Sequence, residues 1–120
     1  MYLSVNPIPL SRCRVWQLPE NFTAPAVALP ATGGATLICP TAEAPENAIR
    51  REDGLRAIVA CDTVDHTLTG ILAGVCTTLA AGGVAICAAV AEAPVFVVIA
   101  DEDTKKAIEV LRSSGYKVEV

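Results

Sequence analysis

Cys61 and His66 are the side chains of this sequence whose types and spacing come nearest to a catalytic pair. A thiolate that lies beside an imidazole can act as a nucleophile. The chain has one histidine, however, and nothing in the sequence marks a third group that would orient it. We therefore expect no enzymatic activity, with Cys61 buried in a strand and His66 exposed in a loop.

The cysteines also bear on metal binding and on the cellular compartment. There are five of them, an odd number without a C-x-x-C spacing: Cys13, Cys39, Cys61, Cys76 and Cys87. This pattern predicts neither a zinc site nor a disulfide framework, and each thiol is expected to be buried among apolar neighbours. The N-terminus shows no signal-peptide pattern, so the sequence favours a cytoplasmic location.

The composition predicts a folded protein that does not bind nucleic acid. The chain has 120 residues, of which 52% are hydrophobic and 18% are charged, which suits one compact domain or two very small subdomains that share one core. The net charge is −4, and the nine basic residues are scattered apart from Arg50-Arg51 and Lys105-Lys106. We interpret both pairs as solvated faces, because phosphate binding depends on clustered basic residues.

The segment 67–91 carries no charged residue, and its length alone would permit a transmembrane helix. Gly82-Gly83 interrupts the segment, many of its residues are weakly hydrophobic alanines, and basic flanking residues are missing. We therefore expect a helix followed by a strand, and no membrane span.

The C-terminal part of the chain shows the clearest periodicity. The pattern predicts a strand over 55–60, a helix from residue 67 or 68 to Gly82 or Gly83, strands over 84–90 and 95–99, a helix that opens at 101–103, and a strand over 116–120. Apolar residues at helical spacing mark the buried face of the first helix: Leu68, Ile71, Leu72, Val75 and Leu79. This order predicts an α+β, ferredoxin-like βαββαβ fold, with two helices on one face of a four-stranded antiparallel sheet.

The first 54 residues are expected to form a degenerate copy of the same unit that extends the sheet, so that the domains are 1–54 and 55–120. The segment 12–18 alternates like a half-buried strand, with Cys13 and either Val15 or Trp16 inward. Strands over 26–29 and 35–39 should form a hairpin around the glycine-containing turn 30–34. Pro45 is placed to begin a short helix that continues over 46–51.

Several of these segments resemble an ACT domain. The resemblance is carried by a strand followed by Asp65-x-x-x-Thr69-Gly70-Ile-Leu-Ala and Leu79-Ala-x-Gly-Gly83-Val-x-Ile86. Over roughly residues 10–120, the chain is similar to small tandem-ACT proteins related to aspartokinase regulatory regions and to eukaryotic arginine sensors. This closer likeness rests on Leu37-Ile-Cys-Pro40, Gly54-Leu-Arg-Ala57 and Asp65-His-Thr-Leu-Thr-Gly70.

The resemblance implies a regulatory module that binds an amino acid or a similar metabolite at an interface between ACT units, without catalysis and without a cofactor. The implied ligand contacts are Asp65, Thr67, Leu68, Thr69 and Gly70. A helix N-terminus offers N–H groups and partial positive charge to a carboxylate, and a glycine lets the ligand approach the backbone. Alternatively, Asp65 caps the helix and Thr69 bonds back to its own turn.

One departure from the family favours a second hypothesis. Relatives carry Ser, Thr and Asp residues across the hairpin, where this chain has Val90-Ala-Glu-Ala-Pro-Val95-Phe96. Val95 replaces an Asp suited to a ligand's ammonium group, and Glu92 is expected to be solvated at the hairpin tip. The chain could therefore be a structural or protein-interaction domain whose pocket has been lost. Under the first hypothesis, that of a ligand-binding module, the exposed sheet edges and the apolar excess predict a homodimer.

Overall fold

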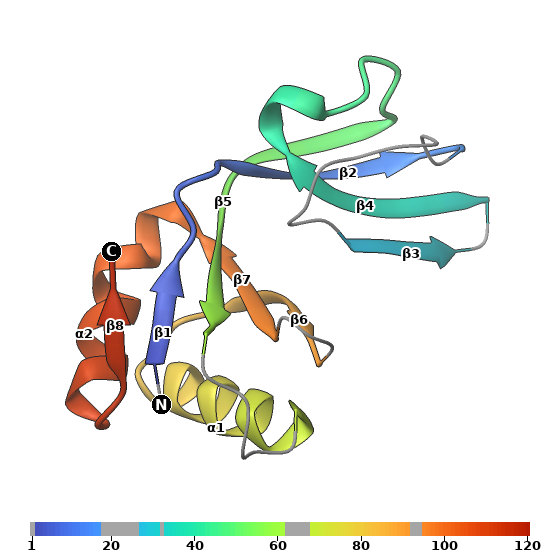
Figure 1. Cartoon of the computed structure of the whole chain (residues 1–120). Coiled ribbons are helices and arrows are strands. Elements are labelled where there is room, and N and C mark those ends of the chain that lie inside the picture. Colours follow the sequence, from blue (N-terminus) through green and yellow to red (C-terminus); the bar gives the residue numbers. More distant parts are fainter. Residues whose placement is uncertain (1, 18–26, 32, 62–67, 92–94) are drawn as a thin grey trace. The chain divides into compact units, whose positions relative to one another are not determined.

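The computed structural model describes residues 2–17, 27–31, 33–61, 68–91 and 95–120 (Figure 1). The chain falls into two compact units, one formed by Met1–Pro7 with Arg56–Val120 and the other by Ile8–Leu55. We call them the α+β unit and the β unit. The division into a degenerate ACT-like half, 1–54, and an ACT domain, 55–120, stays a prediction.

The α+β unit has the ferredoxin-like order of elements that the sequence predicts. The elements are strand β5 (Arg50–Ala60), helix α1 (Leu68–Ala81), strands β6 (Ile86–Val90) and β7 (Phe96–Ala100), the short helix η2 (Asp101–Asp103), helix α2 (Thr104–Ser113) and strand β8 (Lys117–Glu119). β5 is longer than expected, and its first residues belong to the β unit. The mixed α+β fold is therefore confirmed.

A fifth strand, β1 (Tyr2–Val5), was not predicted, and it lies inside the sheet of this unit (Figure 1). The strand order is β6–β7–β5–β1–β8. Leu3 is the partner of Ala60 in an antiparallel pair and of Val118 in a parallel pair. The expectation of a purely antiparallel four-stranded sheet is thus corrected, because β1 takes the place between β5 and β8.

Both helices share one core with this sheet. Ile71, Val75 and Leu79 of α1 are buried at the predicted spacing, and Leu72 is half-buried. Ala107 and Leu111 of α2 are fully buried in the same cluster, together with residues of β1, β5, β7 and β8. Burial of each large aliphatic side chain stabilises the fold by about 1.5–3 kcal/mol relative to exposure.

The β unit contains strands β2 (Leu10–Val15), β3 (Val27–Ala31) and β4 (Gly34–Pro40), the short helix η1 (Thr41–Glu43) and the first part of β5. β3 and β4 form the predicted antiparallel hairpin, and Gly33 at its turn has a φ of +74°, which favours glycine. On one face of the unit, Cys13, Val15 and Ala35 are buried and pack against Ala44 and Ala48.

One expectation for this unit is wrong, and one alternative that the sequence left open is decided. The segment 46–51 does not form a helix: Arg50 and Arg51 belong to β5 and are partners of Arg14 and Cys13 in β2. A helix of six residues is unstable by itself, so strand pairing decides the outcome. Trp16 is 71% exposed, because the strand register directs Cys13 and Val15 inward.

A polar network lies on the inward face of the β unit. The buried Ser11 hydroxyl donates to Asp53 Oδ1 at 2.5 Å and lies 2.8 Å from the Thr41 hydroxyl. Arg51 Nε donates to the same carboxylate oxygen at 2.8 Å. These hydrogen bonds, with Arg51 first and Ser11 second, hold the pKa of Asp53 below its ordinary value.

In the part of the chain that the structure describes, no helix is both long enough and apolar enough to cross a membrane.

The contact between the two helices gives a first prediction. A Cβ atom added at Gly82 would lie 2.5 Å from both Cγ atoms of Val110, and the branched valine cannot turn both of them away. We expect Gly82→Ala to lower the free energy of unfolding by about 1–3 kcal/mol in urea titrations. In a protein that already carries Val110→Ala, the same Gly82→Ala substitution should cost much less stability, because the two Cγ atoms are gone. Equal losses with and without Val110→Ala would contradict this packing.

The polar network predicts a pH effect. Because the pKa of folded Asp53 is lowered, its contribution to stability is complete above the ordinary value of 3.8 and is lost as the pH falls toward the folded value. In urea unfolding at a series of acidic pH values, the wild-type protein should lose stability more steeply below pH 3.8 than Asp53→Asn. Asp103→Asn, which removes a carboxylate outside this network, should behave like wild type. Parallel curves for wild type and Asp53→Asn would refute the assignment.

Candidate functional site

The residues expected to contact a ligand lie at the start of α1. Asp65 and Thr67 lie outside the described residues, as does His66. Leu68 and Thr69 are the first residues of α1, and Gly70 follows them, exposed in the first helical turn. The first turn contains no acidic residue, so no carboxylate of its own offsets the partial positive charge of the helix N-terminus.

Three strand ends lie close together where the chain leaves β5 toward α1. The Ala60 N–H donates to the Val95 carbonyl at 2.9 Å, which joins the end of β5 to the residue before β7. The Cys61 N–H donates to the Tyr2 carbonyl at 3.0 Å, which joins the same end to β1. Val95, which replaces the expected ammonium-binding Asp, therefore lies beside the point from which the chain proceeds to α1.

The space beneath α1 near Val95 is closed and apolar. Val95 is only 2% exposed and belongs to the core cluster. The cavity there measures about 10 Å³ and is lined by Leu3, Ile58, Ala60, Leu72, Val75, Val95, Phe96 and Val97. A single water molecule needs about 10–15 Å³, so this cavity has no room for a metabolite. A ligand at this end of the unit would have to bind outside this cavity.

Cys61 does not have the environment of an activated nucleophile. It is exposed rather than buried, which corrects the expectation for this thiol. Partial desolvation and then the nearby Glu119 carboxylate raise its pKa, so the thiol form predominates at neutral pH. Its Sγ donates a weak hydrogen bond to the Val59 carbonyl at 3.7 Å.

The other thiols differ in burial. Cys13 and Cys39 are buried as expected, whereas Cys76 and Cys87 are half-buried. Desolvation raises the pKa of Cys39 to about 11, and the neighbouring Cys13 adds to this effect. Among the described residues, no group of three or more His, Cys, Asp and Glu side chains is arranged to hold a metal ion.

A second hollow of the α+β unit lies beside α1 and the turn between α2 and β8. It measures about 490 Å³ and is lined by Ala73, Gly74, Thr77, Thr78, Ser114, Gly115 and Tyr116. The Thr78 hydroxyl donates to the Gly74 carbonyl at 2.9 Å, so that hydroxyl is already engaged. Among the described residues, no charged side chain lines the hollow, so these residues offer little to hold a charged metabolite.

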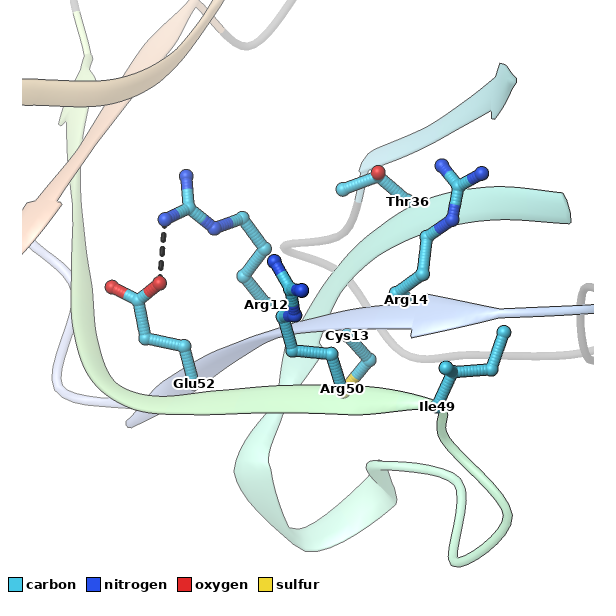
Figure 2. Close-up of a pocket in the computed structure, with 7 residues that line it drawn as sticks. All are labelled: Arg12, Cys13, Arg14, Thr36, Ile49, Arg50 and Glu52. Atoms are coloured by element: carbon cyan, nitrogen blue, oxygen red, sulfur yellow. Dashed lines mark hydrogen bonds and ion pairs between the residues drawn. The ribbon is translucent and has the colours of Figure 1, made fainter. Parts of the chain in front are cut away.

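The β unit holds a basic hollow that the sequence interpretation missed. It measures about 560 Å³ and is lined by Arg12, Cys13, Arg14, Thr36, Ile49, Arg50 and Glu52 (Figure 2). Figure 2 shows that the three arginine side chains project from the same side of β2 and β5. Arg12 donates to Glu52 at 2.5 Å. The alternation of Arg12 and Arg14 along one strand was the available signal; the contribution of Arg50 depends on strand pairing.

No protein-family model matches this chain, and no curated protein sequence matches it.

Solved structures match almost all of the chain. The structure of a protein from Agobacterium tumefaciens has a TM-score of 0.83 at 15% identity, covering 98% of this chain and 90% of that one. The aspartokinase alpha and beta subunits give a TM-score of 0.68 at 16% identity, covering 93% and 91%. The aspartate kinase of Clostridium acetobutylicum, described as an allosteric enzyme, gives 0.67 at 11% identity, covering 93% of this chain and 34% of that one.

These similarities concern the fold, because the identities are too low to carry function by themselves. The chain shares the ferredoxin-like α+β arrangement with an aspartokinase subunit of nearly equal length. It spans about a third of the Clostridium enzyme. This chain is therefore similar in fold to aspartokinase subunits.

Proposed function

We propose that this chain is a non-catalytic regulatory module of the ACT type that binds an amino acid or a similar small carboxylate at the start of α1. The observation that carries the proposal is the first turn of α1 in the α+β unit, which contains no acidic residue and in which Gly70 is exposed. The helix dipole favours an anion at a helix N-terminus. Gly70 leaves the backbone of this turn open to close approach.

The proposal also accounts for the closed core. Since the cavity at Val95 holds no ligand, the carboxylate would bind at the outer surface of the helix start. Val95 cannot pair with an ammonium group. A partner for that group would come from a second copy of the chain, as in a site between ACT units. The module would then act as a homodimer whose ligand lies at the interface.

A regulatory role is supported by the kind of protein that has this fold. The aspartate kinase of Clostridium acetobutylicum is described as allosteric, and this chain matches about a third of its length. A chain that consists of such a fold could transmit ligand binding to a partner by a change of affinity between copies, as allosteric coupling requires.

A second candidate function is a structural or protein-interaction domain without a ligand. The specific observation in its favour is Val95, which is 2% exposed and fills the position where an amino-acid site would place a carboxylate. This candidate predicts that no small molecule raises the stability of the protein.

Thermal unfolding in the presence of each common amino acid distinguishes the two candidates. If the module binds one of them, that amino acid at millimolar concentration should raise the melting temperature, and the effect should increase with its concentration. The amide of the same amino acid, which lacks the carboxylate, should raise the melting temperature less. If none of the amino acids shifts the melting temperature, the regulatory proposal fails and the second candidate is favoured.

Substitution of Gly70 tests the position of the site. Gly70→Ala should leave the free protein at least as stable, since alanine is favoured over glycine in helices by up to about 1 kcal/mol. The added methyl group should nevertheless weaken binding of the active amino acid severalfold in calorimetric titrations. Ala73→Ser, at an exposed position one turn further along α1, is the matched control and should bind normally. Unchanged binding by Gly70→Ala would place the ligand elsewhere.

A further inference from the structure

The basic hollow of the β unit brings together arginines that are far apart in the sequence. In the register of β2 with β5, Arg14 is the direct partner of Arg50 and Arg12 is the direct partner of Glu52. In the register of β2 with β4, Arg14 is also the partner of Thr36. Arg14, Arg50 and Thr36 thus form one row across three strands, on the face opposite the inward network of Ser11 and Asp53.

The row places two like charges directly opposite each other. Side chains in such an antiparallel pair have Cβ atoms about 4.5–5.5 Å apart, and like charges at this separation destabilise the sheet. Arg14 is half-buried, so water screens this repulsion incompletely. Both arginines stay protonated at neutral pH, because the pKa of a guanidinium group is far above neutrality. An anion between the two guanidinium groups would remove the repulsion.

The local charge balance favours such an anion. Three arginines and one glutamate line the hollow, which leaves two positive charges in excess although the whole chain has a net charge of −4. Glu52 lies in the neighbouring row and is engaged by Arg12 at 2.5 Å. Arg50 has no ion-pair partner among the described residues, and its side chain is exposed.

We propose that this hollow binds the phosphate group of a small metabolite, or free phosphate, between Arg14, Arg50 and the Thr36 hydroxyl. Guanidinium groups form paired, charge-assisted hydrogen bonds with phosphate oxygens. A tetrahedral dianion can accept bonds from two guanidinium groups and a hydroxyl on different sides, whereas a single planar carboxylate is satisfied by one guanidinium fork.

The size of the hollow indicates a small molecule. Its volume of about 560 Å³ is within the range of roughly 300–1,000 Å³ that is usual for small-molecule sites. Ile49, 48% exposed at the rim, offers an apolar surface to the rest of such a ligand. The site lies wholly in the β unit and does not depend on the function proposed for α1.

Phosphate titration of the full chain tests the proposal. At a pH where phosphate is doubly charged, inorganic phosphate should raise the melting temperature in a saturable way, while sodium chloride of equal ionic strength should not. Calorimetry with inorganic phosphate and with glycerol phosphate then distinguishes the source. Tighter binding of the ester indicates a phosphorylated metabolite, and equal or tighter binding of inorganic phosphate indicates the free ion.

Two neighbouring arginines provide matched variants. Arg50→Gln should weaken phosphate binding about tenfold or more, since it removes a charge-assisted hydrogen-bond pair, and should raise the melting temperature of the phosphate-free protein by relieving the repulsion. Arg51→Gln removes the same charge from the opposite face of β5 and should keep normal phosphate affinity. Arg14→Gln should reproduce the loss, which preserves the test if one variant folds poorly.

Three results would overturn the proposal. The first is an equal shift with chloride and phosphate, which would show general screening of charge. The second is an equal loss of phosphate affinity in Arg50→Gln and Arg51→Gln, which would show that total charge and not this face is responsible. The third is binding of single-stranded oligonucleotides without binding of phosphate or its small esters.

Discussion

The α+β unit depends on the pairing of β1 with two strands at once. Tyr2–Val5 lies between β5 and β8, antiparallel to one and parallel to the other. Both backbone edges of β1 are therefore used, and Leu3 and Val5 enter the same core as α1 and α2. In this arrangement the inner edges of β5 and β8 pair with β1 and not with each other, and an edge left unpaired would be open to association with other chains.

The order of elements from β5 to β8 could be predicted because each segment carries its own signal. Ile71, Val75 and Leu79 repeat at helical spacing, and Gly83, with a φ of +79°, marks the end of α1. β1 has no comparable signal. It has only four residues, and its partners lie at residues 58–60 and 117–119, so a local pattern could not show that it belongs inside the sheet.

The one error in the first half and the one alternative left open there have the same origin. The segment containing Arg50 and Arg51 has a weak helical preference, but pairing with β2 makes it a strand. For Trp16 the sequence left two registers open, and only the position of β2 between β4 and β5 decides which residues face inward. In both cases the deciding interactions join residues that are twenty or more positions apart.

The candidate sites also differ in whether a local sequence pattern could reveal them. The start of α1 could be located from the sequence because a helix N-terminus has a local signature and chemistry of its own. The basic hollow could not, since Arg14 and Arg50 become neighbours only through the register of two strands. The net charge of the whole chain is negative, so it gave no indication that the residues lining this hollow are mostly positive.

The discontinuity of the α+β unit has a consequence for the order in which the chain folds during synthesis. Ile8–Leu55 is contiguous, so the β unit has all its strands once residue 55 has left the ribosome. β1 emerges earlier than its partners but must wait for the second part of β5, and its other edge waits until β8 has been made. Closing such long loops is slow, so the β unit would fold first while a short apolar strand remains unpaired. β1 is thus made before the β unit but paired after it, and chaperones that bind apolar segments have that interval in which to reach it.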